Sequence, residues 1–197
     1  MFALPAFIRD LRRMDTALWL ALILFLLGGV TGWLGTGSIE RLLAGQLEGL
    51  SKISGELRDS SHPQWSFFWF IFMNNSIKCV AVIYLGALFG VLPAVFLLIN
   101  GAVIGYVIHL SLQQGQDLFE LIVKGLLPHG IVEIPALLIA CAIGLQFGRE
   151  VIRQMSGTAG RPLSHLLRQT VTGAFWVVVL MFIAALIEST ITFALLS

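Results

Sequence analysis

Charged residues are scarce in this sequence. Only 12% of the residues are Asp, Glu, Lys or Arg, while 57% are hydrophobic; a soluble domain carries roughly 25% charged residues. So little polar surface cannot cover a globule in water. The composition therefore excludes a soluble domain and predicts an integral membrane protein in contact with the lipid bilayer. The net charge of +1 gives no reason to expect a nucleic-acid partner.

Several motifs that carry chemistry are also missing. The sequence has no glycine-rich phosphate loop and no HExxH metal motif. Its two cysteines, Cys79 and Cys141, lie inside apolar runs, so we expect them to pack as small hydrophobic residues. No serine or cysteine of these runs has an evident basic partner. We therefore expect no enzymatic activity, no catalytic residue and no required cofactor.

Five apolar segments are long enough to cross a bilayer, which takes about 20 helical residues. They cover residues 16–34, 65–89, 92–112, 121–147 and 170–196. Alternating barrel strands are absent, so the expected fold is all-α, a polytopic membrane protein forming one membrane domain over residues 1–197. The first segment has a longer apolar run than a signal peptide and no A-x-A-like site after it, so we expect it to be a retained anchor.

The basic residues predict how the spans are oriented. Arg9, Arg12 and Arg13 precede the first span, and the loop 148–169 carries four more arginines. Cytoplasmic segments carry the excess of Lys and Arg, and an odd number of spans separates the N-terminus from the C-terminus. Both clusters therefore predict an N-terminus inside and a C-terminus outside.

Residues 38–61 form an amphipathic segment between the first two spans. Ile39, Leu43 and Leu47 begin a row of apolar residues at helical spacing, and charges occupy the other face. Two interpretations stay open. The helix rests on the outer membrane surface, or its charged face docks an extracytoplasmic partner; its slightly acidic composition is unusual for a membrane-bound helix.

Small residues recur every four positions in several spans. They include Gly101, Gly105, Ala136, Ala140, Gly144 and Gly148. Such stripes let helix backbones approach closely. We expect them to serve helix packing, and the same stripes offer a face for a homodimer.

Polar residues inside the spans predict an intramembrane site. They are Asn74, Asn75, Lys78, Asn100, His129, Glu133 and Glu188. A charge near the bilayer centre costs about 2.5–3.5 kcal/mol. The simplest arrangement turns these groups toward one another, with Lys78 offsetting a glutamate.

The segment LPHGIVEIPALLIA predicts a break in the fourth span. Pro128 and Pro135 each remove a backbone donor, Gly130 lets another backbone come close, and His129 and Glu133 share a helical face. Broken helices of this kind mark ion or substrate sites in transporters. The alternative is that the two polar side chains merely satisfy groups freed by the kink. A weaker hypothesis is a metal site formed by His129, Glu133 and Glu188.

Four segments carry a resemblance to a known family. They are FMNNSIK, LPAVFLLINGAVIGY, LLPHGIVEIPALLIACAIGLQFG and LIESTITF, within residues 65–197. In these the chain resembles the stage II sporulation protein M (SpoIIM) family of bacterial membrane proteins. The resemblance implies a multi-pass protein of the bacterial cytoplasmic (inner) membrane. It also implies cell-wall hydrolases as partners, because the founding members act with a lytic transglycosylase and an amidase during spore engulfment.

Three functions follow as hypotheses. The first is a membrane subunit that anchors or organises extracytoplasmic partners. The second is a transporter, channel or lipid-handling permease that uses the polar intramembrane site. The third is an intramembrane metal-binding enzyme.

Overall fold

The computed structural model describes residues 2–35, 38–117, 119, 122, 127–158 and 162–196. The side chains of residues 38–40, 46, 50, 127–129, 163 and 191–196 lie outside this description. Every regular element described is helical, in the order α1 (Leu4–Arg12), α2 (Asp15–Leu34), α3 (Ser38–Arg58), α4 (Pro63–Leu85), α5 (Val91–Gln113), α7 (Leu127–Met155) and α8 (Leu163–Leu196).

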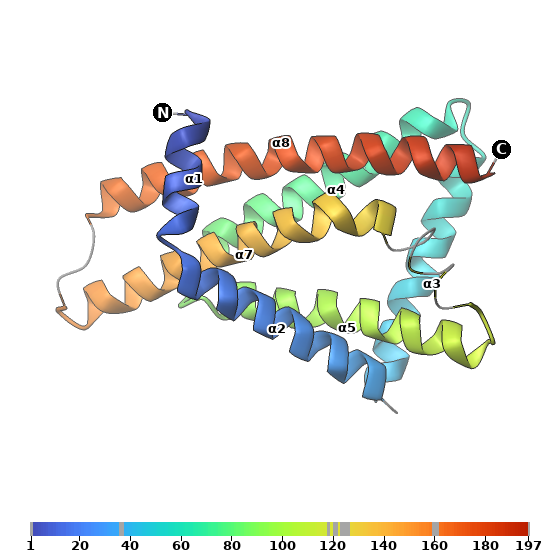
Figure 1. Ribbon diagram of the computed structural model, residues 1–197, viewed down its shortest axis with the longest axis horizontal. Helices are drawn as coiled ribbons and strands as arrows, with labels where there is room; N and C mark the ends of the chain where they lie inside the picture. Colours follow the sequence, from blue (N-terminus) through green and yellow to red (C-terminus); the bar gives the residue numbers. More distant parts are fainter. Residues whose placement is uncertain are drawn as a thin grey trace.

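Five of these helices are long and apolar enough to cross a membrane, which confirms the predicted all-α, five-span class. They are α2, α4, α5, α7 and α8. In Figure 1, α7 runs between the α2–α5 pair and the α4–α8 pair. The largest buried side chains include Ile83, Leu97, Val177 and Met181, one or more from each of α4, α5 and α8. The core therefore lies around α7.

Glycines allow the closest helix contacts. A Cβ added to Gly32 of α2 would overlap the backbone of Ala102 on α5, and one added to Gly101 would overlap that of Phe25. Between α4 and α7, Gly86 and Gly144 lie against each other in the same way. Small residues are the means by which apolar helices bring their backbones together in lipid.

The small-residue stripes are therefore used within one chain. Ala136 and Ala140 are fully buried, and Gly105 and Gly148 lie against the backbones of α2 and of the α4–α5 turn. These surfaces already face neighbouring helices of the same molecule, as expected for helix packing. The expected homodimer stays a prediction.

The last two helices are longer than the apolar segments predicted. α7 continues to Met155 and α8 begins at Leu163, so most of the expected loop 148–169 is helical. A 34-residue helix is about 51 Å long at 1.5 Å per residue, which exceeds the roughly 30 Å of hydrocarbon. α8 is therefore longer than the hydrocarbon is thick, and the arginines of α7 and α8 lie beyond the predicted apolar segments.

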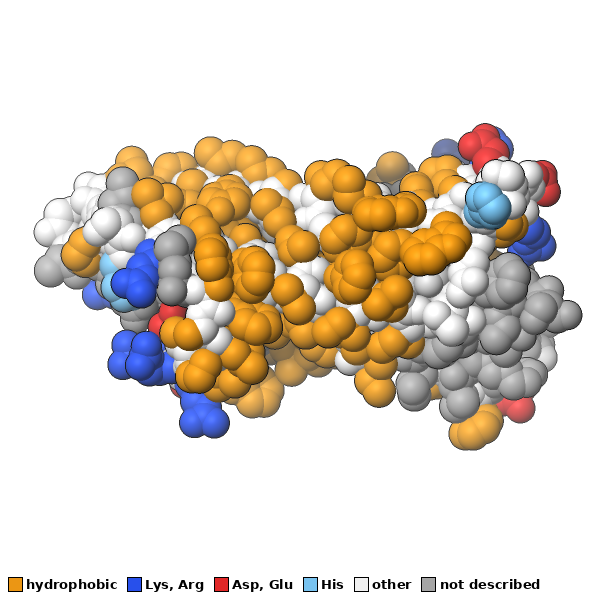
Figure 2. Space-filling view, turned by 90° about the horizontal axis from the view of Figure 1, so that it is seen from above, with side chains coloured by type: hydrophobic (Ala, Val, Ile, Leu, Met, Phe, Trp, Pro, Cys, Tyr) orange, Lys and Arg blue, Asp and Glu red, His pale blue; other side chains and the backbone are white. Residues whose placement is uncertain are grey.

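The two charged ends of the molecule differ. In Figure 1, α1 and the α7–α8 connection lie toward one end, while α3 and the C-terminus lie at the other. Figure 2 shows a broad apolar surface between these ends, with Lys and Arg side chains gathered at the α7–α8 end. We refer to this as the basic end. The predicted orientation places it inside.

α3 crosses the opposite end at a steep angle to the spans (Figure 1). Its apolar side packs on α5, where Leu43 is buried with Ala102 and Tyr106, and Leu47 packs beside them. Its charged residues, including Glu48 and Lys52, remain exposed. The helix thus directs its apolar side toward the protein and leaves its charged side outward.

Candidate functional sites: interhelical polar groups and a basic cavity

The asparagines of the predicted intramembrane site form hydrogen bonds within their own helices. Asn74 donates to the side-chain oxygen of Asn75 at 3.1 Å. Asn100 donates to the carbonyl of Phe96 at 2.7 Å, one turn earlier on α5. All three are partly buried. These bonds satisfy polar groups where little water is present, but they do not themselves join one span to another.

Lys78 and Glu133 come from different spans and lie near the same buried residue. Cys79 of α4, which is 1% exposed, follows Lys78 in the chain and lies within electrostatic range of Glu133. Glu133 of α7 therefore lies near the part of α4 that carries Lys78. Lys78 itself is exposed, because at 100° per residue the buried position on α4 falls to Cys79. The pairing of Lys78 with a glutamate stays a prediction.

The remaining predicted site residues lie on α7 and α8. Glu188 is partly buried on α8, which packs against both α4 and α7. His129 is in the first turn of α7, and its side chain lies outside the described residues. Among the described residues, no group of three His, Cys, Asp or Glu side chains is close enough to hold a metal. A meeting of His129, Glu133 and Glu188 stays a prediction.

The predicted break in the fourth span is not present between Leu127 and Met155, where α7 is one continuous helix. Pro128 is the second residue of α7, a position at which helices tolerate proline. Pro135 lies inside the helix and is exposed. A Cβ at Gly130 would meet only Ile134 of the same helix among the described atoms, at 3.1 Å. Among the described residues, Gly130 therefore does not let the backbone of another helix come close.

The structure also contains a buried polar pair that sequence analysis missed. Glu150, near the basic end of α7, is 1% exposed. Gln146 donates a hydrogen bond to its Oε1 at 3.1 Å, and Arg153 Nη1 lies 3.7 Å from the same oxygen. The spacing of four residues in QFGRE was a usable signal. The charged residues around Glu150 instead predict that it lies in the loop 148–169.

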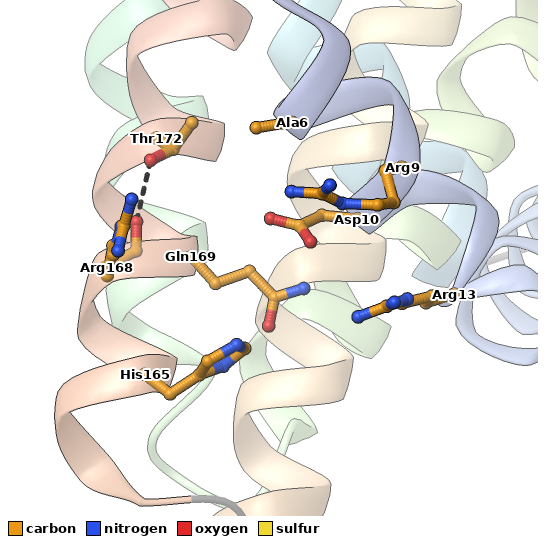
Figure 3. Close-up of a pocket in the computed structure, with 8 residues that line it drawn as sticks. All are labelled: Ala6, Arg9, Asp10, Arg13, His165, Arg168, Gln169 and Thr172. Atoms are coloured by element: carbon orange, nitrogen blue, oxygen red, sulfur yellow. Dashed lines mark hydrogen bonds between the residues drawn. The ribbon is translucent and has the colours of Figure 1, made fainter. Parts of the chain in front are cut away.

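A cavity of about 200 Å³ lies between α1 and α8 at the basic end. Its lining residues are Ala6, Arg9, Asp10, Arg13, His165, Arg168, Gln169 and Thr172. Figure 3 shows Arg9 and Arg13 extending from α1 toward α8, whose residues His165 and Gln169 extend to meet them. With three arginines and one aspartate, the lining carries two positive charges in excess, counting the histidine as neutral.

The walls of this cavity are held by aromatic contacts and buried polar groups. Phe7, 6% exposed, stacks on Trp176 of α8 with ring centroids 5.9 Å apart. On the α8 side, Gln169 is 7% and Thr172 4% exposed. The Gln169 amide donates to the sulfur of Met14 at 3.6 Å. These contacts fix α1 against α8 and hold the polar groups of the cavity in place.

In the sequence, the arginines indicate orientation. Their spacing is a second signal, because it predicts which side chains share a helical face. Arg9 and Arg13 are four residues apart on one helical face, and His165, Gln169 and Thr172 share a face of α8 at spacings of four and three. That these two faces meet depends on α1 folding back onto α8, which no local pattern reveals.

The helices and their polar groups define a multi-pass α-helical membrane protein. Comparison with known families is more specific: residues 21–193 match the model of the family described as Stage II sporulation protein M. The match covers most of the chain, so this chain belongs to the SpoIIM family, as the resemblance in its spans predicted.

Two relatives come from Methanocaldococcus jannaschii, and both are uncharacterized proteins. The first is 27% identical over 175 residues, 88% of this chain and 92% of the relative. The second is 27% identical over 127 residues, 62% of this chain and 54% of the relative. The chain therefore matches only about half of the second protein. No solved structure matches.

Proposed function

We propose that this protein is a non-enzymatic subunit of the bacterial cytoplasmic membrane that anchors extracytoplasmic cell-wall hydrolases. The observation that carries the proposal is the placement of α3. Its apolar side is occupied by α5 through Leu43, so its exposed charged side is directed away from the bundle. A charged helix that packs on the spans through its apolar side is a suitable docking surface. Membership in the SpoIIM family supports the choice of hydrolases as partners.

The salt bridge between Glu48 and Lys52 provides a sharp test. Their side chains are 2.7 Å apart and 67% and 71% exposed. The swap Glu48→Lys with Lys52→Glu keeps the net charge and one ion pair on the helix, but inverts the charge pattern that a partner meets. We expect the swap to reduce recovery of the hydrolase in cross-linking and co-purification from membranes.

The matched control is Gly45→Ala on the same helix, where an added Cβ meets nothing within 4 Å. This variant should recover the hydrolase as the native protein does. Equal recovery by the swap and the native protein would refute docking through the charged face of α3. Hydrolysis of peptidoglycan by the purified protein alone would refute the non-enzymatic role.

A transporter or permease is the second candidate, because Lys78 and Glu133 bring charge to the facing spans α4 and α7. Charged groups within spans commonly belong to ion or substrate pathways. The test is flux through proteoliposomes for the native protein, Glu133→Gln and Glu188→Gln. Transport predicts flux that falls in the variants, and identical flux in all three samples and in empty liposomes would exclude it for the solutes assayed.

A further inference from the structure

We propose that the basic cavity between α1 and α8 binds the phosphate group of an anionic phospholipid. This site is independent of the docking surface on α3, which lies at the opposite end of the molecule (Figure 1). It would tie the protein to anionic lipid in the leaflet at the basic end.

The charge of the cavity selects an anion. Arg9, Arg13 and Arg168 line it together with a single carboxylate, that of Asp10. Guanidinium groups bind phosphate oxygens through paired, charge-assisted hydrogen bonds. Three arginines lining one hollow create a positive potential that attracts an anion. Asp10 offsets one of the three charges and leaves two for a ligand.

Buried polar side chains of α8 form one wall of the cavity. Gln169 and Thr172 are more than nine-tenths buried, and both line the cavity. The hydroxyl of Thr172 donates to the carbonyl of Arg168 at 2.8 Å, which holds it on the helix. In Figure 3, the amide of Gln169 reaches toward Asp10 and Arg13. A cluster of arginines on an open surface would have no buried polar side chains beside it.

The surroundings favour a lipid as the source of the phosphate. α1 exposes Leu4 and Ile8, 46% and 42%, on a face other than the one that lines the cavity. Phe2 packs on Phe175 with ring centroids 4.7 Å apart, and the two residues are 44% and 43% exposed. Apolar and aromatic side chains beside cationic ones are typical of the boundary between hydrocarbon and head groups. A phosphate in the cavity would therefore have acyl chains close by.

Three single variants of α1 with the same loss of charge test the site. All three arginines are exposed, but Arg9→Gln and Arg13→Gln alter the cavity lining, whereas Arg12→Gln removes a charge that does not line it. The full-length protein is placed in nanodiscs of phosphatidylcholine with a minor fraction of phosphatidylglycerol. Native mass spectrometry then counts the phosphatidylglycerol retained on the protein.

We expect the native protein to retain phosphatidylglycerol in preference to phosphatidylcholine. Each cavity variant should bind it about tenfold more weakly, the effect of losing one charge-assisted contact. Arg12→Gln should change binding by less than about twofold, as expected for a solvent-screened charge. An equal loss in all three variants would overturn the proposal, because it would reduce the effect to net charge.

Two further measurements test the phosphate site even if an arginine variant fails to fold. Ala6→Leu fills the cavity without changing its charge and should also lower retention; native retention in this variant would overturn the proposal. Inorganic phosphate is compared with chloride by thermal unfolding in lipid-free detergent. Stabilisation by phosphate, lost in Arg13→Gln, would assign the same site to a soluble phosphate. No discrimination between the two lipids or between the two anions would refute a phosphate site.

Discussion

Phe7 of α1 stacks on Trp176 of α8, with ring centroids 5.9 Å apart and ring planes inclined by 21°. α1 is a short helix, and this contact supplies the buried part of its docking. Replacing a buried Phe by Ala in a core costs about 3–5 kcal/mol. Phe7→Ala should therefore release α1 and speed tryptic cleavage after Arg9, Arg12 and Arg13 several-fold. Ile8→Ala, at a 42% exposed position of the same helix, is the control and should be cleaved at the native rate.

The contact between α2 and α5 predicts opposite effects on stability when either of two nearby glycines is replaced by alanine. A Cβ on Gly32 would lie 2.7 Å from the Cα of Ala102, whereas one on Gly29 meets only the carbonyl of Gly101 at 3.8 Å. Gly32→Ala should force the helices apart and destabilise the protein by about 1–3 kcal/mol. Gly29→Ala should be neutral or up to about 1 kcal/mol more stable, because alanine favours the helix. Thermal unfolding in detergent measures both, and equal Tm values would contradict the packing described.

The buried pair Gln146 and Glu150 should be energetically coupled. Glu150 is almost fully buried and accepts the Gln146 amide, so removing either residue deletes a buried hydrogen bond. A double-mutant cycle of Gln146→Ala and Glu150→Ala should give a coupling free energy of about 1 kcal/mol. Arg153→Ala should cost less than Glu150→Ala, because the guanidinium is 41% exposed and 3.7 Å away. Purely additive effects would argue that the bond contributes nothing.

Orientation can be measured because both native cysteines are inaccessible. Cys79 and Cys141 are 1% and 0% exposed, so the native protein should react little with an impermeant maleimide. Ser61→Cys lies before α4, and Ser156→Cys lies in the α7–α8 connection; both positions are exposed. In intact cells Ser61→Cys should be labelled, and Ser156→Cys should be labelled only after lysis. The reverse pattern would invert the predicted topology.

The spans and α3 could be read from the residue pattern alone because their signals are local. A helix in lipid needs a continuous apolar run of a set length, and a helix at a boundary shows a 3.6-residue period. Five helices of suitable length and apolarity are present, and the amphipathic segment is helical over Ser38–Arg58. Near the arginines, charged residues interrupt the apolar run, and the sequence therefore predicts a loop. The structure is helical there, and Glu150 is buried.

The lateral contacts belong to the three-dimensional arrangement. Which face of α4 turns inward, so that Cys79 is buried and Lys78 exposed, depends on the rotation of that helix against α7 and α8. Likewise, Arg13 and Gln169 share a cavity because α1 folds back onto a helix more than 150 residues later in the chain. Local periodicity describes each helix separately. The pairing of their faces follows from backbone approach at glycines and side-chain packing between helices, which are properties of the assembled bundle.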